Sequence, residues 1–186
     1  MTQMMTFATL AMAGLALAGC ADDRTSLGTT RDSAPSLMLV TDLRTAAGEM
    51  LGTATVSQEA DGARIIAQVR GLPAGDYAMH LHAVGRCDAP DFVSAGPHFN
   101  PAGRQHGRDN PAGAHAGDLP NLTVDANGRG SLSVVQAGLR LADGDLALLD
   151  ADGAAVVLHA KADDYRTDPA GNAGARIACG VLTRGR

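Results

Sequence analysis

MLGTATVSQEADGARIIAQV, residues 50–69, decides the fold class of this chain. Two runs with many Val, Ile and Thr residues, Met50–Gln58 and Ala63–Val69, flank an Asp61-Gly62 pair that is typical of a turn. The same rhythm continues outward in both directions. Further strands are expected at Leu37–Leu43, Tyr77–Ala83, Leu122–Val124, Ser131–Val135, Leu146–Leu149, Ala155–His159 and Ala178–Thr183. Short strands, frequent turns and no sustained helical period predict an all-β, antiparallel sandwich or barrel.

Length and composition bound the domain organisation. The chain has 186 residues, of which 45% are hydrophobic and 19% charged, and this fits one globular domain with a short leader and tether. The formal net charge is -5 and no dense Lys/Arg run occurs, which argues against nucleic acid as a partner. An anionic substrate stays open, because electrostatic steering depends on local rather than net charge.

The N-terminus predicts export. Residues 6–19 are apolar but fewer than the ~20 that span a membrane comfortably, and Leu17-Ala18-Gly19-Cys20 resembles the lipobox of bacterial lipoproteins. We therefore expect a signal peptide over 1–19, lipidation of Cys20, a flexible tether over 20–36 and the folded domain over 37–186. Ala16-Leu17-Ala18 also fits ordinary cleavage and plain secretion. Either route leads to the bacterial cell envelope, facing the periplasm, and Ala21 after Cys20 favours the outer membrane.

Two stretches interrupt the strand pattern. Residues 85–120 are rich in Gly and Pro and contain three histidines, and residues 161–174 are polar and end in Gly-Asn-Ala-Gly. Loops of such length in a compact domain are usually functional or disordered. A bound metal would order the first stretch, so we expect it to be a metal-binding loop.

The six histidines of the chain fit a two-metal site. His80 and His82 stand two residues apart in a predicted strand, so both imidazoles lie on one face and make half of a tetragonal nitrogen site, which favours Cu(II). His159 ends the apolar run Val156-Val157-Leu158 and would be taken, on its own, for a core histidine. The other histidines give it a shared explanation as a ligand.

A second candidate set lies within the first loop and offers three imidazoles and one carboxylate. Its members are His98, His106, His115 and Asp118. Three nitrogens and one oxygen make a closed tetrahedral set, which suits a structural Zn(II).

Five separated motifs then carry a resemblance to a known family. They are His80-Leu81-His82 with Cys87; Ser94-Ala95-Gly96-Pro97-His98-Phe99-Asn100-Pro101; His115-Ala116-Gly117-Asp118-Leu119-Pro120-Asn121; Val157-Leu158-His159 with Asp163-Asp164; and Gly171-Asn172-Ala173-Gly174-Ala175-Arg176-Ile177-Ala178-Cys179-Gly180. Together they resemble the copper–zinc superoxide dismutases over roughly Leu37 to Leu182. The resemblance implies an eight-stranded antiparallel Greek-key β-barrel with a long metal-binding loop and a shorter electrostatic loop.

The resemblance also implies two metal ions and an activity. One copper per chain would be bound by His80, His82, His98 and His159. One zinc per chain would be bound by His98, His106, His115 and Asp118, so His98 would bridge the two metals. The implied reaction is the dismutation of superoxide to oxygen and hydrogen peroxide, through alternate reduction and oxidation of copper.

Other residues match supporting positions of the family. Arg176 resembles the arginine that attracts and docks the superoxide anion beside copper. The resemblance thus implies two catalytic residues, His98 and Arg176. Asp163 resembles the carboxylate that links a copper-ligand imidazole to a zinc-ligand imidazole, here His80 and His106.

Cys87 and Cys179 remain once Cys20 is assigned to lipid. Two such cysteines should pair in an oxidising compartment, and they match the family's intramolecular disulfide. Two free buried thiols are the alternative.

The main alternative to the enzyme is a non-enzymatic copper or zinc buffer of the cell envelope, built on the same barrel. Arg176 argues against it, because a buffer has no use for an anion-attracting arginine over copper. A structural β-sandwich adhesin would not need the histidines. The membrane would be contacted only through the lipid anchor, and a homodimer stays open because family members form dimers.

Overall fold

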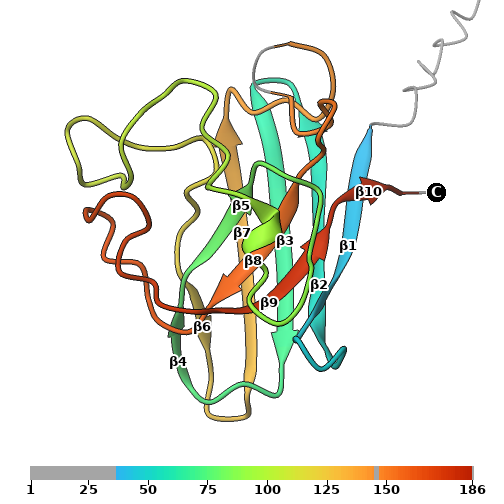
Figure 1. Ribbon diagram of the computed structural model, residues 1–186, viewed down its shortest axis with the longest axis vertical. Helices are drawn as coiled ribbons and strands as arrows, with labels where there is room; N and C mark the ends of the chain where they lie inside the picture. Colours follow the sequence, from blue (N-terminus) through green and yellow to red (C-terminus); the bar gives the residue numbers. More distant parts are fainter. Residues whose placement is uncertain (1–36, 145–146, 186) are drawn as a thin grey trace, which may run out of the picture. The chain divides into compact units, whose positions relative to one another are not determined.

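The computed structural model describes residues 37–144 and 147–185. These residues form ten β-strands and one short 3-10 helix (Figure 1): β1 (Met38–Arg44), β2 (Met50–Glu59), β3 (Gly62–Arg70), β4 (Gly75–Tyr77), β5 (Met79–His82), η1 (Val93–Ala95), β6 (Leu122–Val124), β7 (Arg129–Ala137), β8 (Ala155–His159), β9 (Arg176–Val181) and β10 (Thr183–Arg184). In this part of the chain, no helix is long and apolar enough to cross a membrane. The predicted signal peptide (1–19), the predicted lipidation site Cys20 and the predicted tether (20–36) lie outside the described residues.

The hairpin at residues 50–69 forms as the sequence predicts. β2 and β3 pair antiparallel, from Gly52 opposite Val69 to Glu59 opposite Gly62. Along β3, Ile65, Ala67 and Val69 are buried and the residues between them are exposed. This is the two-residue alternation of a strand with one face on the core.

The strands form one antiparallel sheet that closes almost completely into a barrel. Their order in the sheet is β4-β6-β7-β3-β2-β1-β9-β8-β5, with β10 beside β1. β4 and β5 stand at the two ends of this order but are separated in sequence by Ala78 alone, and β9 and β10 are separated by Leu182 alone. The ten strands are therefore eight extended segments, and the predicted all-β Greek-key barrel is confirmed.

The strand expected at Tyr77–Ala83 is divided where it changes neighbours. β4 pairs with β6, whereas β5 pairs with β8. At the division, the Ala78 N–H donates to Lys161 O at 2.8 Å and the His159 N–H donates to Ala78 O at 2.9 Å. Ala78 thus stays fully bonded while the segment passes from one edge of the sheet to the other.

The prediction of a strand at Leu146–Leu149 is wrong for residues 147–149, the part of this segment that the structure describes. Ala147 forms only a single bridge with Arg140, and the Leu148 N–H donates to Arg140 O at 2.9 Å. Leu148 is 0% exposed, as are Leu139 and Leu141. The leucines fill the core from an irregular segment, and a short apolar run cannot by itself distinguish that arrangement from a strand.

β5 and β8 are buried along their whole length. Met79 and Leu81 belong to the core of the barrel, so the alternating His80 and His82 point outward, yet both are 0% exposed. The long loop between β5 and β6 covers this outer face (Figure 1, green to yellow). A buried polar layer therefore lies between the barrel and its loop.

Candidate metal centre

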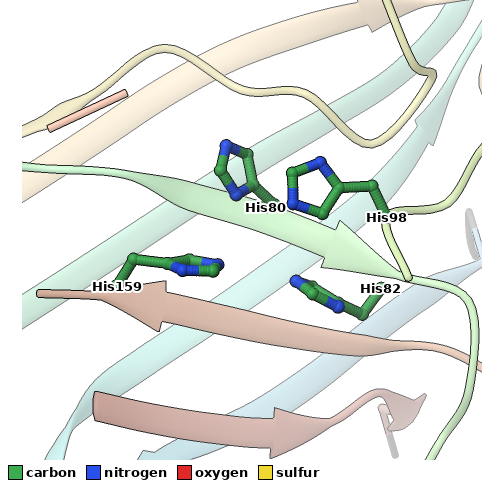
Figure 2. Close-up of side chains that lie close together, drawn as sticks. All are labelled: His80, His82, His98 and His159. Atoms are coloured by element: carbon green, nitrogen blue, oxygen red, sulfur yellow. The ribbon is translucent and has the colours of Figure 1, made fainter. Parts of the chain in front are cut away.

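Four histidines converge on this outer face (Figure 2). His80 and His82 come from β5, and His159 comes from the end of the neighbouring β8. His98 comes from the long loop, which runs beside β5 so closely that His82 and His98 form an isolated antiparallel bridge. The ring centroids of His80 and His98 lie 4.0 Å apart. One strand pair and one loop thus bring together the four residues that the resemblance assigns to copper.

Three of these rings already use one nitrogen. The contacts are His80 Nε2 to Asp163 Oδ2 (2.7 Å), His82 Nδ1 to Gly96 O (2.9 Å) and His159 Nδ1 to Gly174 O (3.3 Å). Carbonyl and ionised carboxylate oxygens only accept hydrogen bonds, so these nitrogens carry the protons. The opposite nitrogen of each neutral ring is left with a free lone pair.

The opposite nitrogens are buried and have no hydrogen-bond partner. They are His80 Nδ1, His82 Nε2, His159 Nε2 and, from the loop, His98 Nε2. Buried polar atoms almost always have a partner. The four residues offer ligand atoms within 4.8 Å of one another, and this donor set fits a copper ion.

Asp118 organises a second group. Its Oδ1 lies 3.0 Å from His98 Nδ1 and 3.1 Å from both His106 Nδ1 and His115 Nδ1. Its Oδ2 accepts the Gly107 N–H at 2.9 Å and the His115 N–H at 3.0 Å. Three imidazoles and one carboxylate fit a zinc ion. His98 offers Nδ1 to this group and Nε2 to the other.

His80 also approaches the second group, since His80, His98, His106 and Asp118 offer ligand atoms within 4.8 Å of one another. Its Nε2, however, is bonded to Asp163, and its unpartnered Nδ1 belongs with the first group. His115 Nδ1 lies 3.4 Å from His98 Nδ1, so the set with His115 is the more consistent one.

Burial favours the neutral, metal-binding form of histidines in the first group, which consists of His80, His82, His98 and His159. It lowers the pKa of His82 to about 2, of His159 to about 3 and of His98 to about 4, so these imidazoles are neutral. Burial also acts to lower the pKa of His106, but the neighbouring carboxylates of Asp118 and Asp163 outweigh it and raise that pKa to about 9. In the metal-free protein, a proton on His106 therefore supplies the positive charge that a metal would bring to the two carboxylates.

Asp163 connects the two groups. Its Oδ2 lies 2.7 Å from His80 Nε2 and its Oδ1 lies 2.9 Å from His106 Nε2. Burial raises the pKa of Asp163, but the hydrogen bonds with His106 and His80 outweigh it and hold the pKa below its usual range. The ionised carboxylate thus fixes one imidazole in each group.

Arg176 lies beside the first group at the start of β9, opposite His159 in the β8–β9 ladder. Its guanidinium donates to Phe92 O at 2.7 Å and to Gly96 O at 2.8 Å. Gly96 O is also the partner of His82 Nδ1, so one loop carbonyl orients both the arginine and a histidine. Burial lowers the pKa of Arg176, and the nearby Asp91 acts in the opposite direction.

The predicted disulfide is confirmed. Cys87 in the long loop is bonded to Cys179 on β9, with Cα atoms 5.6 Å apart. The bond ties the loop to the strand that also carries Arg176.

The sequence analysis missed three residues around the second group. Asn121 accepts the Asp163 N–H at Oδ1 (2.8 Å) and donates from Nδ2 to Asp163 O (3.0 Å). Tyr165 accepts the Asn121 N–H at its hydroxyl oxygen (2.8 Å). Asp168 Oδ1 accepts the His106 N–H (2.6 Å). Asn121 stood within a quoted motif, whereas nothing in the local sequence marks the other two.

Two buried ligand groups that share one histidine, on the outside of a Greek-key barrel, define a two-metal β-barrel protein. The family model for copper/zinc superoxide dismutase matches residues 50–182, and the chain belongs to this family. Copper and zinc are accordingly its cofactors, and the family supports superoxide dismutation as its general activity.

Relatives from several bacteria agree. Superoxide dismutase [Cu-Zn] 1 of Aquifex aeolicus is 44% identical over 137 residues, which cover 73% of this chain and 81% of the relative. Superoxide dismutase [Cu-Zn] of Deinococcus radiodurans is 38% identical over 194 residues, which cover 98% of both chains. The crystal structure of a SOD-like protein from Bacillus subtilis matches with a TM-score of 0.74 at 39% identity, covering 77% of this chain and 97% of that one.

Proposed function

We propose that this chain dismutates superoxide to oxygen and hydrogen peroxide with two bridged metal ions. Copper would be held by His80, His82, His98 and His159, and zinc by His98, His106, His115 and Asp118. The observation that carries the proposal is the position of His98, whose two ring nitrogens face different buried groups. An imidazole that bridges two metals must lose both ring protons, and two divalent cations favour this by depressing its pKa.

The chemistry that copper supplies when bound is the alternate one-electron oxidation and reduction of superoxide, and zinc, which has no redox chemistry, holds the loop. The protein's part is to orient the ligands and to handle protons. His98 is 5% exposed, and its Nε2 can hold a proton whenever no metal occupies that nitrogen. It can then pass this proton to the peroxide product.

Arg176 is proposed to dock the superoxide anion. Its guanidinium is held beside the copper group by Phe92 O and Gly96 O, so its charge is fixed in place before the anion arrives. A preorganised cation in a partly buried setting attracts a small anion more strongly than a mobile surface charge does.

The first experiment measures dismutation by the purified chain and counts copper and zinc in the same preparation. We expect one copper and one zinc per chain and rapid, cyanide-sensitive turnover. Both metals with negligible turnover would instead favour a non-enzymatic metal buffer. The relative from Bacillus subtilis is called only a SOD-like protein, so its name does not claim the activity.

An Arg176→Ala variant separates the enzyme from the buffer more finely. We expect both metals to stay bound while turnover at low salt falls at least about tenfold, because anion steering is worth roughly 10- to 1,000-fold. Arg64→Ala is the matched control, since Arg64 pairs with Glu59 on the β2–β3 hairpin, outside the site. An unchanged rate in Arg176→Ala would remove the docking role.

We further propose that the mature protein is lipidated on Cys20 and faces the periplasm. Labelling of cells with a radioactive fatty acid should mark the wild-type chain and leave Cys20→Ser unmarked. An unlabelled wild type would support plain secretion instead.

A further inference from the structure

We propose that Tyr165 is a positioning residue for the zinc group, and that its side chain holds the two loops of the site together. The proposal rests on the proposed function, in which zinc occupies the group around Asp118. Tyr165 lies in the shorter loop, between β8 and β9, two residues after Asp163. Figure 1 shows this loop (red) beside the far end of the long loop (yellow-green).

On one side, Tyr165 secures Asp163. Its N–H donates to Asp163 Oδ1 at 2.6 Å, the same oxygen that meets His106 Nε2 at 2.9 Å. Its hydroxyl oxygen accepts the Asn121 N–H at 2.8 Å, and Asn121 in turn bonds the backbone of Asp163 on both sides. Tyr165 thus closes a ring of hydrogen bonds around the carboxylate that orients a zinc-group imidazole.

On the other side, Tyr165 holds the zinc-binding segment itself. Its carbonyl oxygen accepts the Asp109 N–H at 3.0 Å, and the Arg108 guanidinium carbon lies 3.8 Å from the centre of its ring. Gly107 packs so closely that a Cβ there would come within 2.1 Å of Tyr165 O. Since the Gly107 N–H donates to Asp118 Oδ2, these contacts reach the zinc group through a single residue.

The backbone conformation of Tyr165 indicates that these contacts outweigh the local preference of the chain. Its φ is 61°, in the left-handed region that a bulky side chain rarely adopts. Such a conformation persists only where surrounding interactions hold it. The position calls for an aromatic face under a cation and a hydroxyl acceptor at the tip, and among the standard side chains tyrosine alone offers both.

The effect should be selective for zinc. Among the four proposed copper ligands (His80, His82, His98 and His159), His82 is oriented by Gly96 O and His159 by Gly174 O. Neither contact involves Tyr165. Loss of the tyrosine side chain therefore loosens the segment 106–109 and leaves most of the copper ligands in place.

Tyr165→Phe and Tyr165→Leu test the proposal against Tyr77→Phe. Tyr77 is the chain's other tyrosine; it is half-buried at the end of β4, and its hydroxyl donates to Pro73 O at 2.9 Å. Zinc affinity is measured by competition with a chromophoric chelator, and site geometry by the visible spectrum of the cobalt-substituted protein. We expect about 10- to 100-fold weaker zinc binding in Tyr165→Leu, the usual range for residues that orient metal ligands. Tyr165→Phe should show a smaller loss, and Tyr77→Phe none.

Arg108→Gln provides a second test that leaves Tyr165 intact, and it should weaken zinc binding in the same direction. Wild-type zinc affinity and an unchanged cobalt spectrum in folded Tyr165 variants would overturn the proposal. So would a loss of thermal stability that is equal with and without zinc, because that pattern marks a purely structural role. A wild-type chain that binds no zinc at all would instead overturn the proposed function, so the two failures are distinguishable.

Discussion

Single contacts decide which atom of each histidine is available to a metal. A neutral imidazole has one donor and one acceptor nitrogen, and the partner of the donor selects the tautomer. For His82 and His159 that partner is a loop carbonyl, Gly96 O or Gly174 O, and for His80 it is the Asp163 carboxylate. The conformations of the two loops therefore matter as much to the metal site as the histidines do.

Gly171 shows how little room the Asp163 contact leaves. A Cβ on Gly171 would lie 1.9 Å from Asp163 Oδ1 and 2.7 Å from His106 Nε2. We predict that Gly171→Ala displaces the carboxylate and weakens zinc binding by at least about tenfold, measured by chelator competition.

Gly174→Ala is the matched control for that prediction. Both glycines have a left-handed φ, 62° and 75°, so both substitutions carry the same kind of backbone strain. At Gly174, however, the nearest neighbour of a Cβ is Lys161 Cγ at 3.4 Å. Equal losses of zinc affinity in the two variants would show that strain, and not the contact with Asp163, is responsible.

At the scale of elements, the site depends on a loop that forms strand-like backbone hydrogen bonds with β5. On the side of β5 away from β8, the Leu81 N–H donates to Gly117 O and the Phe99 N–H donates to Leu81 O, at 2.9 and 2.8 Å. A Cβ on Gly117 would lie 2.4 Å from Leu81 O, so the close approach requires glycine. β5 thus carries two histidines and also sets the position of the loop that carries His98, His106 and His115.

The disulfide restrains the same loop from its other end. Cys87 and Cys179 are 92 residues apart, and a cross-link that closes so long a loop lowers the entropy of the unfolded chain. We predict that Cys87→Ala/Cys179→Ala lowers the free energy of unfolding by about 2–5 kcal/mol, measured by urea denaturation. Reduced wild-type protein is the control for the substitutions themselves. A loss below about 1 kcal/mol in both would mean that the other contacts of the loop suffice.

Much of this arrangement could be predicted from the sequence, because ligand types and spacings are local. The strand at Ala155–His159 and the hairpin at residues 50–69 follow from local patterns, and so does the shared face of His80 and His82. The exchange of neighbours at Ala78 could not be predicted, because it depends on barrel closure. The contact of Tyr165 with Asn121 spans 44 residues, and no local pattern encodes such a pairing.

At the scale of the whole molecule, metal binding is coupled to protonation and so to stability. A metal-free chain keeps a layer of buried imidazoles and carboxylates between barrel and loop. Metals bind deprotonated ligands, so acid opposes loading, and a metal that binds only the folded chain adds its binding free energy to stability.

Metal-free protein should be most stable near pH 6.5. His82, His98 and His159 have folded pKa values of about 2, 4 and 3, below the ~6.5 of the unfolded chain, so stability falls as pH drops below ~6.5. His106, with a pKa of about 9, contributes stability that is complete below ~6.5 and lost as pH rises toward 9. Each group changes the unfolding free energy by at most about 1.4 kcal/mol per pH unit. Because three histidines act on the acid side and one on the alkaline side, stability should fall more steeply toward acid.

Urea denaturation of chelator-treated protein at pH 5, 6.5 and 9 checks this, with His106→Asn as the control that should lose the alkaline decline. Greater stability at pH 5 than at pH 6.5 would contradict the neutral, buried state of the copper-group histidines.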